Sequence, residues 1–381
     1  MACFTLYNPV KLHFGKGALD KLGKEAGEYG KKALLILGKG SVKANGSYHE
    51  AVSKLKEGSV EVFEYSGIKS NPIIEDIEKA AELGRKKKVN MVIGLGGGSV
   101  IDSAKIIALA ISNPESPWDI VTGKVRPKSA LPVICILTLA ATGTEMNPYA
   151  VVQNTKLKKK VGYGHKLMYP KISFLDPTFT LSVPKNYTAY GIVDLIAHSL
   201  EAYFGKGEAS LSDRFTLAII KEAIKNGPEL LENLNNYELR EKIMYAATCA
   251  LNGITFVGKE SPDWGVHDIG HTLSVLYDIP HGASLSIAYP AWLKLQSQRI
   301  PEKIIELGYN VFATSKVDDT IYKLEYFFKM LGSPIKLSQA GINLDEKAKE
   351  QLFKTMAKNK VSGVAHTLSE EDYRFLIEEM L

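Results

Sequence analysis

The sequence contains few cysteines, and their spacing forms no recognisable framework. Only three occur among 381 residues, at Cys3, Cys135 and Cys249, and none belongs to a CxxC pair. This spacing argues against a disulfide scaffold and against a CxxC-type metal or redox site. The N-terminal segment also lacks a basic region followed by an apolar core. We therefore expect a cytoplasmic protein without a signal peptide.

Long apolar runs and a strong excess of one charge are absent as well. No run approaches the roughly 20 residues of a membrane-spanning helix. The formal net charge is +5, and lysine clusters such as 156–160 lack the interleaved aromatics of a single-strand nucleic-acid platform. We expect neither a membrane nor a nucleic-acid partner. The chain has an ordinary globular composition, with 45% hydrophobic and 23% charged residues, and is long enough for two domains.

Strand and helix patterns alternate in the first half of the chain. Apolar runs such as ALLILG (33–38) and VNMVIGL (89–95) predict strands buried on both faces, and IIEDIEKAAELGRKKK (73–88) predicts a helix. Further strands are expected within 11–15, 60–67, 131–145 and 171–180. Strands alternating with helices indicate a parallel sheet covered by helices.

The second half of the chain has a different sequence pattern. From about Pro184 onward, stretches such as TAYGIVDLIAHSLEAYF and LSDRFTLAIIKEAIKNG carry helical periodicity, and little suggests a strand. A proline-led break near 183–187 marks the change. We therefore predict an α/β domain over residues 1–185 and an all-helical domain over residues 186–381.

A glycine-rich loop joins one predicted strand to the helix after it. Residues 94–99 read GLGGGS, and the helix begins near Val100. Successive glycines let the backbone approach a charged group, and a helix N-terminus presents free N–H groups, so the loop suits a diphosphate. It is neither GxGxxG nor a Walker A sequence, and a tight turn without a ligand is the alternative. Asp102 either caps this helix or faces the cofactor.

Four of the eight histidines lie between residues 194 and 281. Asp194 and His198 are four residues apart and project from one helix face. His267, His271 and His281 follow within a short tract. One carboxylate with several imidazoles suits a first-row divalent metal such as Fe²⁺ or Zn²⁺. Ordinary histidines on helix surfaces are the alternative, and spacing alone cannot separate His267 from His271.

Taken together, these segments resemble a known family. GGGSVIDSAK, TLAATGTE, GIVDLIAHSLEAYF and HDIGHTLSVLYDIPHG, in this order, are similar to the iron-containing (group III) alcohol dehydrogenases. LILGKGSVKANGSY makes the chain most similar to the NAD(P)H-dependent butanol dehydrogenase branch. The resemblance implies a dinucleotide-binding N-terminal α/β domain and a metal-binding, catalytic all-helical C-terminal domain, with the metal in the cleft between them.

The resemblance also assigns residues to roles. It implies Asp194, His198, His267 and His281 as ligands of Fe²⁺, or of Zn²⁺ or another divalent ion. His271 would lie near the nicotinamide, where we expect it to relay the proton to solvent. Because Pro280 precedes His281, that ligand should come from a break after a helix. The expected cofactor contacts are Gly38, Ser41, Asn71, Gly97, Gly98, Ser99, Thr138, Thr142 and Lys160.

The choice of dinucleotide depends on the residues after the strand that ends near Gly38. NAD-preferring relatives place an aspartate there to accept from the ribose 2′-hydroxyl. This chain has Gly38-Lys39-Gly40-Ser41, which contains no carboxylate to repel a 2′-phosphate, while Lys39 and Ser41 could donate to one. We therefore predict that NADP(H) is preferred over NAD(H), with exchange tolerated.

The reaction implied is a reversible hydride transfer between NAD(P)(H) and a primary alcohol or aldehyde such as butanol or butanal. In it the metal polarises the substrate oxygen. The family also implies a homodimer. Two alternatives keep the fold, a glycerol dehydrogenase-like polyol oxidoreductase and a dehydroquinate synthase-like lyase. The region 194–281 has no obvious Lys/Arg cluster for the phosphorylated substrate of such a lyase. A metallohydrolase would leave the nucleotide-type half without a role.

Overall fold

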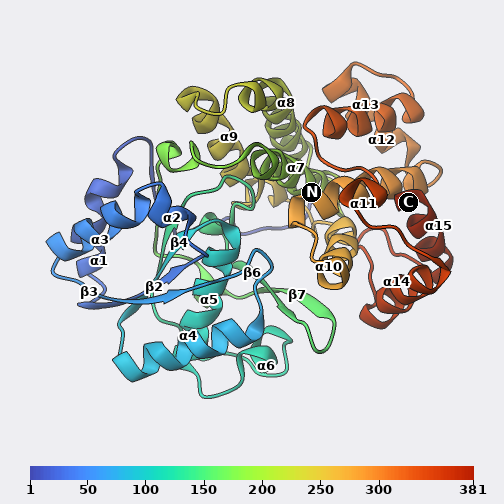
Figure 1. The fold of residues 1–381 in the computed structure, drawn as a ribbon. Helices are drawn as coiled ribbons and strands as arrows, with labels where there is room; N and C mark the ends of the chain where they lie inside the picture. The colour runs from blue at the N-terminus through green and yellow to red at the C-terminus, as the bar shows by residue number, and fades with distance from the viewer. The chain divides into compact units, whose positions relative to one another are not determined.

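The computed structural model describes residues 1–381, which form two compact units (Figure 1). The α/β unit comprises Tyr7–Val183 and Asn235–Met244. The helical unit comprises Met1–Leu6, Pro184–Leu234 and Tyr245–Leu381. Between these two long segments the division falls between Val183 and Pro184. Two short segments depart from a division at residue 185: the first six residues belong to the helical unit, and residues 235–244 belong to the α/β unit.

The α/β unit is built on a six-stranded sheet with the order β1-β8-β5-β4-β2-β3. Every neighbouring pair is parallel, which confirms the predicted parallel sheet. The chain runs from β2 to the edge strand β3 and then returns to β4 on the other side of β2. A crevice opens at such a reversal, beyond the carboxyl ends of the strands, and it is a common ligand site. The strands are β1 (Lys11–Phe14), β2 (Lys32–Leu37), β3 (Glu61–Ser66), β4 (Met91–Gly96), β5 (Val133–Leu137) and β8 (Ile172–Leu175).

Helices cover both faces of this sheet (Figure 1). Along β2, Leu34 and Ile36 join the core formed with α4 (Ile74–Lys87) and α5 (Gly98–Ser112). The alternate residue Leu35 joins the opposite core, formed with α1 (Leu22–Gly27) and α3 (Ser47–Glu57). Both faces of the strand are therefore apolar, and this explains why β2 appears in the sequence as an unbroken hydrophobic run.

Two elements of this unit differ from the sequence prediction. The run 131–145 is a strand only as far as Leu137, and it continues as a loop that contains the short 3₁₀ helix η2 (Thr144–Met146). The chain then forms an antiparallel hairpin of β6 (Tyr149–Asn154) and β7 (Lys159–Gly164), which was not predicted. The lysine run 156–160 supplies the hairpin turn, where Lys158 has a left-handed φ of 51°.

The helical unit contains the expected succession of helices and, within 186–381, no strand beyond one isolated bridge between Lys206 and Ser261. The break expected before His281 is present: α10 ends at Tyr277, Asp278 has a φ of 52°, and His281 is the first residue of α11. None of the helices combines the length and apolar character that crossing a bilayer requires. The helices from residue 185 onward are α7 (Lys185–Tyr203), α8 (Ser210–Glu232), α9 (Tyr237–Ala250), α10 (Gly265–Tyr277), α11 (His281–Gln296), α12 (Pro301–Phe312), α13 (Val317–Met330), α14 (Glu346–Asn359) and α15 (Glu370–Met380). Of these, α9 begins within the α/β unit and ends in the helical unit.

Candidate functional site

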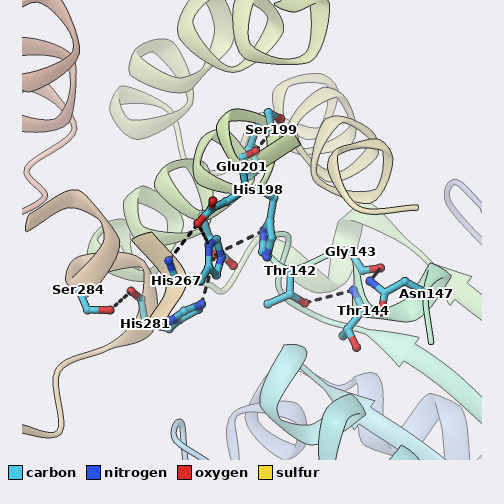
Figure 2. Close-up of polar contacts among 12 residues, drawn as sticks. Thr142, Gly143, Thr144, Asn147, His198, Ser199, Glu201, His267, His281 and Ser284 are labelled. Atoms are coloured by element: carbon cyan, nitrogen blue, oxygen red, sulfur yellow. Dashed lines mark hydrogen bonds and ion pairs between the residues drawn. The ribbon is translucent and has the colours of Figure 1, made fainter. Parts of the chain in front are cut away.

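Three helices of the helical unit bring a carboxylate and imidazoles together. Asp194 comes from α7, His267 from α10 and His281 from the first turn of α11. One donor atom from each lies within 4.8 Å of the other two. The Asp194 Oδ1 atom is 3.7 Å from His281 Nε2 and 4.0 Å from His267 Nε2. Figure 2 shows the His267 and His281 rings converging from their separate helices.

His198, the fourth predicted ligand, lies beside this group without belonging to it. Its Nδ1 atom is 3.5 Å from the same Asp194 Oδ1, and its ring centroid is 4.6 Å from that of His267. The one-turn spacing of Asp194 and His198 on α7 accounts for this approach. The structure thus brings three predicted ligands into one set of donor atoms and places His198 against two of them.

The donor set fits a divalent metal ion. The separations of 3.5–4.0 Å between Asp194 Oδ1 and the imidazole nitrogens exceed the usual length of a hydrogen bond. Two donors that share one ion at metal–ligand distances near 2.1 Å lie roughly 3.0–3.6 Å apart, close to this range. His267 Nε2 and His198 Nδ1 are buried and make no hydrogen bond within the protein. Buried nitrogens in this state are costly unless a cation or another partner satisfies them.

Burial also sets the protonation of His198. The ring is enclosed, and this desolvation, reinforced by the neighbouring His267, lowers the pKa of His198 well below its usual range. A neutral imidazole is the form that binds a metal, so no proton has to be displaced from His198 at neutral pH.

His271 lies one helical turn after His267 on α10. Its ring stacks on that of His281 at 5.5 Å between centroids and 29° between planes, and it meets the His267 ring edge-on at 6.4 Å. His271 therefore adjoins the donor set without contributing to the three-atom group. His267 thus belongs to the three-atom group and His271 does not, which spacing alone could not predict.

Glu201 is a residue of this site that sequence reasoning missed. It is buried on α7, and its Oε1 atom accepts two hydrogen bonds from His267, one from Nδ1 at 2.8 Å and one from the backbone N–H at 3.0 Å. The signal was present in the sequence, because Asp194, His198 and Glu201 follow one another at four and three residues on one helix face.

The α/β unit holds the glycine-rich loop at the predicted strand-to-helix junction. Gly97 precedes α5, Gly98 is its first residue, and no side chain caps the helix N-terminus. The first N–H groups of the helix are therefore available to an anion. A Cβ atom added at Gly98 would lie only 2.7 Å from the Thr142 side chain, so only glycine allows this close approach.

The other predicted cofactor residues gather around this loop. The Thr138 N–H donates to Gly96 O at 3.0 Å, and Ser99 Oγ donates to Ser70 O beside Asn71. Lys160 Nζ in turn donates to Asn71 Oδ1 at 2.9 Å, which joins the β6–β7 hairpin to the segment after β3 that Ser99 contacts.

Gly38 follows β2, and a Cβ placed there would be 3.7 Å from Val100 of α5. Ser41 opens the short helix α2 (Ser41–Ala44) that follows. All nine predicted residues therefore belong to the loops and first turns that follow β2, β3, β4 and β5, and to the hairpin strand β7.

Asp102 and Lys105 connect α5 to the neighbouring loop. Of the two roles considered for Asp102, a cap of α5 or a contact with the cofactor, the cap is not observed. Asp102 accepts from Thr144 Oγ1 at 2.6 Å and from the Val151 N–H at 2.9 Å. Lys105 is fully buried and donates to Thr144 Oγ1 at 2.6 Å and to Tyr149 O at 2.7 Å. Desolvation by burial lowers the pKa of Lys105 to about 8. Both residues thus tie α5 to the segment that carries Thr142.

We expect Lys105→Met to destabilise the protein strongly. The change leaves buried oxygens of Thr144 and Tyr149 without their donor and leaves Asp102 without its nearby cation. Removal of one member of a buried charged network costs about 3–5 kcal/mol of unfolding free energy. Urea denaturation monitored by circular dichroism measures this loss. The matched variant Lys86→Met, at an exposed lysine, should change the unfolding free energy by less than about 0.5 kcal/mol, because surface substitutions have small effects.

A parallel α/β unit with a glycine loop at an uncapped helix N-terminus, together with a helical unit carrying an Asp/His donor set, is the arrangement expected of a metal-dependent enzyme that uses a dinucleotide. Residues 9–177 match the protein-family model "Iron-containing alcohol dehydrogenase", and residues 188–380 match "Fe-containing alcohol dehydrogenase family, C-terminal". The chain belongs to the iron-containing alcohol dehydrogenase family. It is accordingly an alcohol/aldehyde oxidoreductase that uses iron and a nicotinamide cofactor. The family match does not support the polyol oxidoreductase and lyase alternatives.

Individual relatives place the chain within this family. It is 38% identical to the probable NADH-dependent butanol dehydrogenase 1 of Bacillus subtilis, over 100% of both chains. It is 35% identical to the NADPH-dependent aldehyde reductase of Escherichia coli, over 89% of both. The crystal structure of NADH-dependent butanol dehydrogenase A from Thermotoga maritima superposes with a TM-score of 0.96 at 36% identity and covers 100% of this chain and 99% of that one. Relatives with this fold thus use either form of the cofactor.

Proposed function

We propose that the protein interconverts short primary alcohols and aldehydes, such as butanol and butanal, with Asp194, His198, His267 and His281 holding the iron. The observation that carries the proposal is the convergence of Asp194, His267 and His281 donor atoms within 4.8 Å. Relatives named as butanol dehydrogenases and as an aldehyde reductase support this substrate class.

In this proposal the helical unit provides the metal ligands and the α/β unit provides the cofactor contacts. Bound iron supplies Lewis acidity toward the substrate oxygen, and the nicotinamide accepts or donates the hydride. The single carboxylate of Asp194 among neutral imidazoles leaves part of the positive charge of a divalent ion uncompensated, which favours a developing negative oxygen. The N-terminus of α5 with Gly97 and Gly98 would bind the diphosphate, while Asn71 and Lys160 would bind nearby groups of the cofactor.

We propose NADP(H) as the preferred cofactor. Residues Gly38 to Ser41 form the connection after β2 and contain no carboxylate. The loop after β3 contacts this connection through a hydrogen bond from the Gly67 N–H to Gly38 O at 3.2 Å. Lys39 and Ser41 are exposed there and can donate to a 2′-phosphate. NAD(H) lacks only that phosphate and would still bind, which agrees with relatives that use either cofactor.

His271 is proposed to relay the proton between substrate and solvent. The His271→Ala change should lower kcat about 10²-fold, the usual contribution of a positioned acid–base group, while the protein keeps its iron. Metal content and kcat measured on the same preparation test this. Loss of iron together with activity would contradict the relay role and assign His271 to metal binding.

A metal analysis combined with a cofactor comparison tests the proposed function as a whole. We expect about one iron per chain after anaerobic iron loading, and oxidation of NADPH that depends on added butanal and exceeds oxidation of NADH in kcat/KM. Butanal, longer aldehydes, dihydroxyacetone and a dehydroquinate-type precursor should be compared. Turnover of the last two without aldehyde reduction, or activity that survives complete metal removal, would refute the proposal.

A homodimeric state and a cytoplasmic location are part of the same proposal. Sedimentation equilibrium of the full chain tests the first, because a dimer has twice the 41.8 kDa mass of the chain. The location is tested by fractionating cells that express the protein.

A further inference from the structure

Glu201 makes two bonds to a single residue of the donor set. Its Oε1 atom accepts from both His267 Nδ1 at 2.8 Å and the His267 backbone N–H at 3.0 Å. The carboxylate is buried, with 1% of the residue exposed, and Figure 2 labels it with His267 and His198. A carboxylate that accepts from the second ring nitrogen is a common partner of a metal-binding histidine.

The first bond determines which nitrogen of His267 faces the donor set. A carboxylate oxygen can only accept, so Nδ1 must carry the proton. In a neutral ring the lone pair then lies on Nε2, the atom that is 4.0 Å from Asp194 Oδ1 and makes no hydrogen bond within the protein. The second bond fixes the backbone of His267 in the first turn of α10. Ring orientation and tautomer are therefore both set from Glu201.

We propose that Glu201 is a positioning residue of the metal centre, which holds His267 in the one tautomer and orientation that can bind the ion. The inference rests on the proposed metal site. Acceptors bonded to the second nitrogen of a metal-binding histidine raise metal affinity about 10- to 100-fold. Because α7 carries Asp194, His198 and Glu201, one rigid helix supplies two ligands and the acceptor that positions a third.

A purely structural role for Glu201 makes a different prediction. The same oxygen satisfies an N–H group at the start of α10, as a helix cap does, and the Glu201 carbonyl accepts from the Asp263 N–H at 3.0 Å. If this packing were the only role, substitution would lower thermal stability while leaving the ion coordinated as before. The test must therefore measure the ion itself.

Cobalt-loaded protein provides that measurement. Co²⁺ reports its ligands through its visible absorption, and a competing chelator reports how fast it leaves. We expect Glu201→Ala to release Co²⁺ about 10- to 100-fold faster than the unaltered protein and to shift its visible bands. Glu201→Gln keeps the shape and one acceptor oxygen but removes the charge, so a smaller change in the same direction is expected.

The matched control is Asp263→Asn, which alters a buried acid of the same region that bonds to backbone N–H groups of Gly265, Ala365 and His366 and to no histidine ring. It should release Co²⁺ at the unaltered rate. Unchanged release and unchanged spectra in both Glu201 variants would overturn the inference; if Glu201→Ala fails to fold, Glu201→Gln decides alone. An unaltered protein that binds no Co²⁺, or an Asp194→Ala variant that keeps it, would instead refute the proposed metal site.

Discussion

Asp194→Ala is expected to yield a folded protein without stoichiometric iron and to lower kcat for aldehyde reduction by about 10³-fold or more. The Asp194 carboxylate is the only negative charge in the donor set, and nitrogens of three histidines lie 3.5–4.0 Å from its Oδ1 atom. Without it, a divalent ion would be held by neutral imidazoles alone. Lewis-acid stabilisation of the developing negative oxygen is worth several kcal/mol, and each 1.4 kcal/mol corresponds to about a tenfold change in rate.

Two measurements check this result. Metal content after anaerobic iron loading should fall from about one per chain to near zero, and the thermal midpoint should no longer rise when iron is added, because only binding to the folded state stabilises it. Asp194→Asn separates charge from shape and should behave almost as Asp194→Ala does. Asp268→Asn, a half-buried acid one residue after His267 on α10, is the control that should keep both iron and activity. Full activity in iron-free Asp194→Ala would rule out a metal-dependent reaction.

The main outline of the fold could be predicted because its strands are buried on both faces. Strand β2 needs apolar residues toward both cores, and that requirement leaves a continuous run in the sequence. The β6–β7 hairpin lacks this requirement: along β7 every residue is exposed or half-buried, and only Val161 and Tyr163 pack against the core, so Lys159 to Gly164 form no continuous apolar run. Its place depends on bonds to distant residues, such as Lys160 to Asn71. Such contacts do not follow from local periodicity.

The candidate site was predictable to the extent that its residues follow helical spacing. Asp194 and His198 are one turn apart, and their pairing follows from the geometry of α7 alone. His267 and His271 have the same spacing, and only the position of α10 against α7 and α11 decides which of them faces Asp194. For Asp102 the sequence left open a helix cap or a contact with the cofactor, and the structure instead shows its carboxylate bonded to Thr144 and to the Val151 N–H, which lie far away in the sequence.

Gly38→Asp is expected to reverse the cofactor preference by lowering kcat/KM for NADPH about 10²-fold or more while leaving that for NADH equal or higher. A carboxylate after β2 would accept from the ribose 2′-hydroxyl of NADH and repel the 2′-phosphate of NADPH. Like charges brought together in a binding site cost several kcal/mol, which corresponds to at least this ratio. The measurement is kcat/KM for each cofactor at saturating butanal.

Gly38 is a suitable position for this substitution. A Cβ there would meet Val100 at 3.7 Å and Ile68 O at 3.8 Å, which are ordinary van der Waals contacts, so a Cβ atom is accommodated at this position. Gly40, two residues later, has a φ of 141° and would be strained by any side chain. Gly38→Asn is the isosteric control and should change the ratio of the two cofactors far less, because it lacks the charge. An equal loss with both cofactors would indicate a distorted loop, and undiminished use of NADPH would mean that the 2′-phosphate does not bind near Gly38.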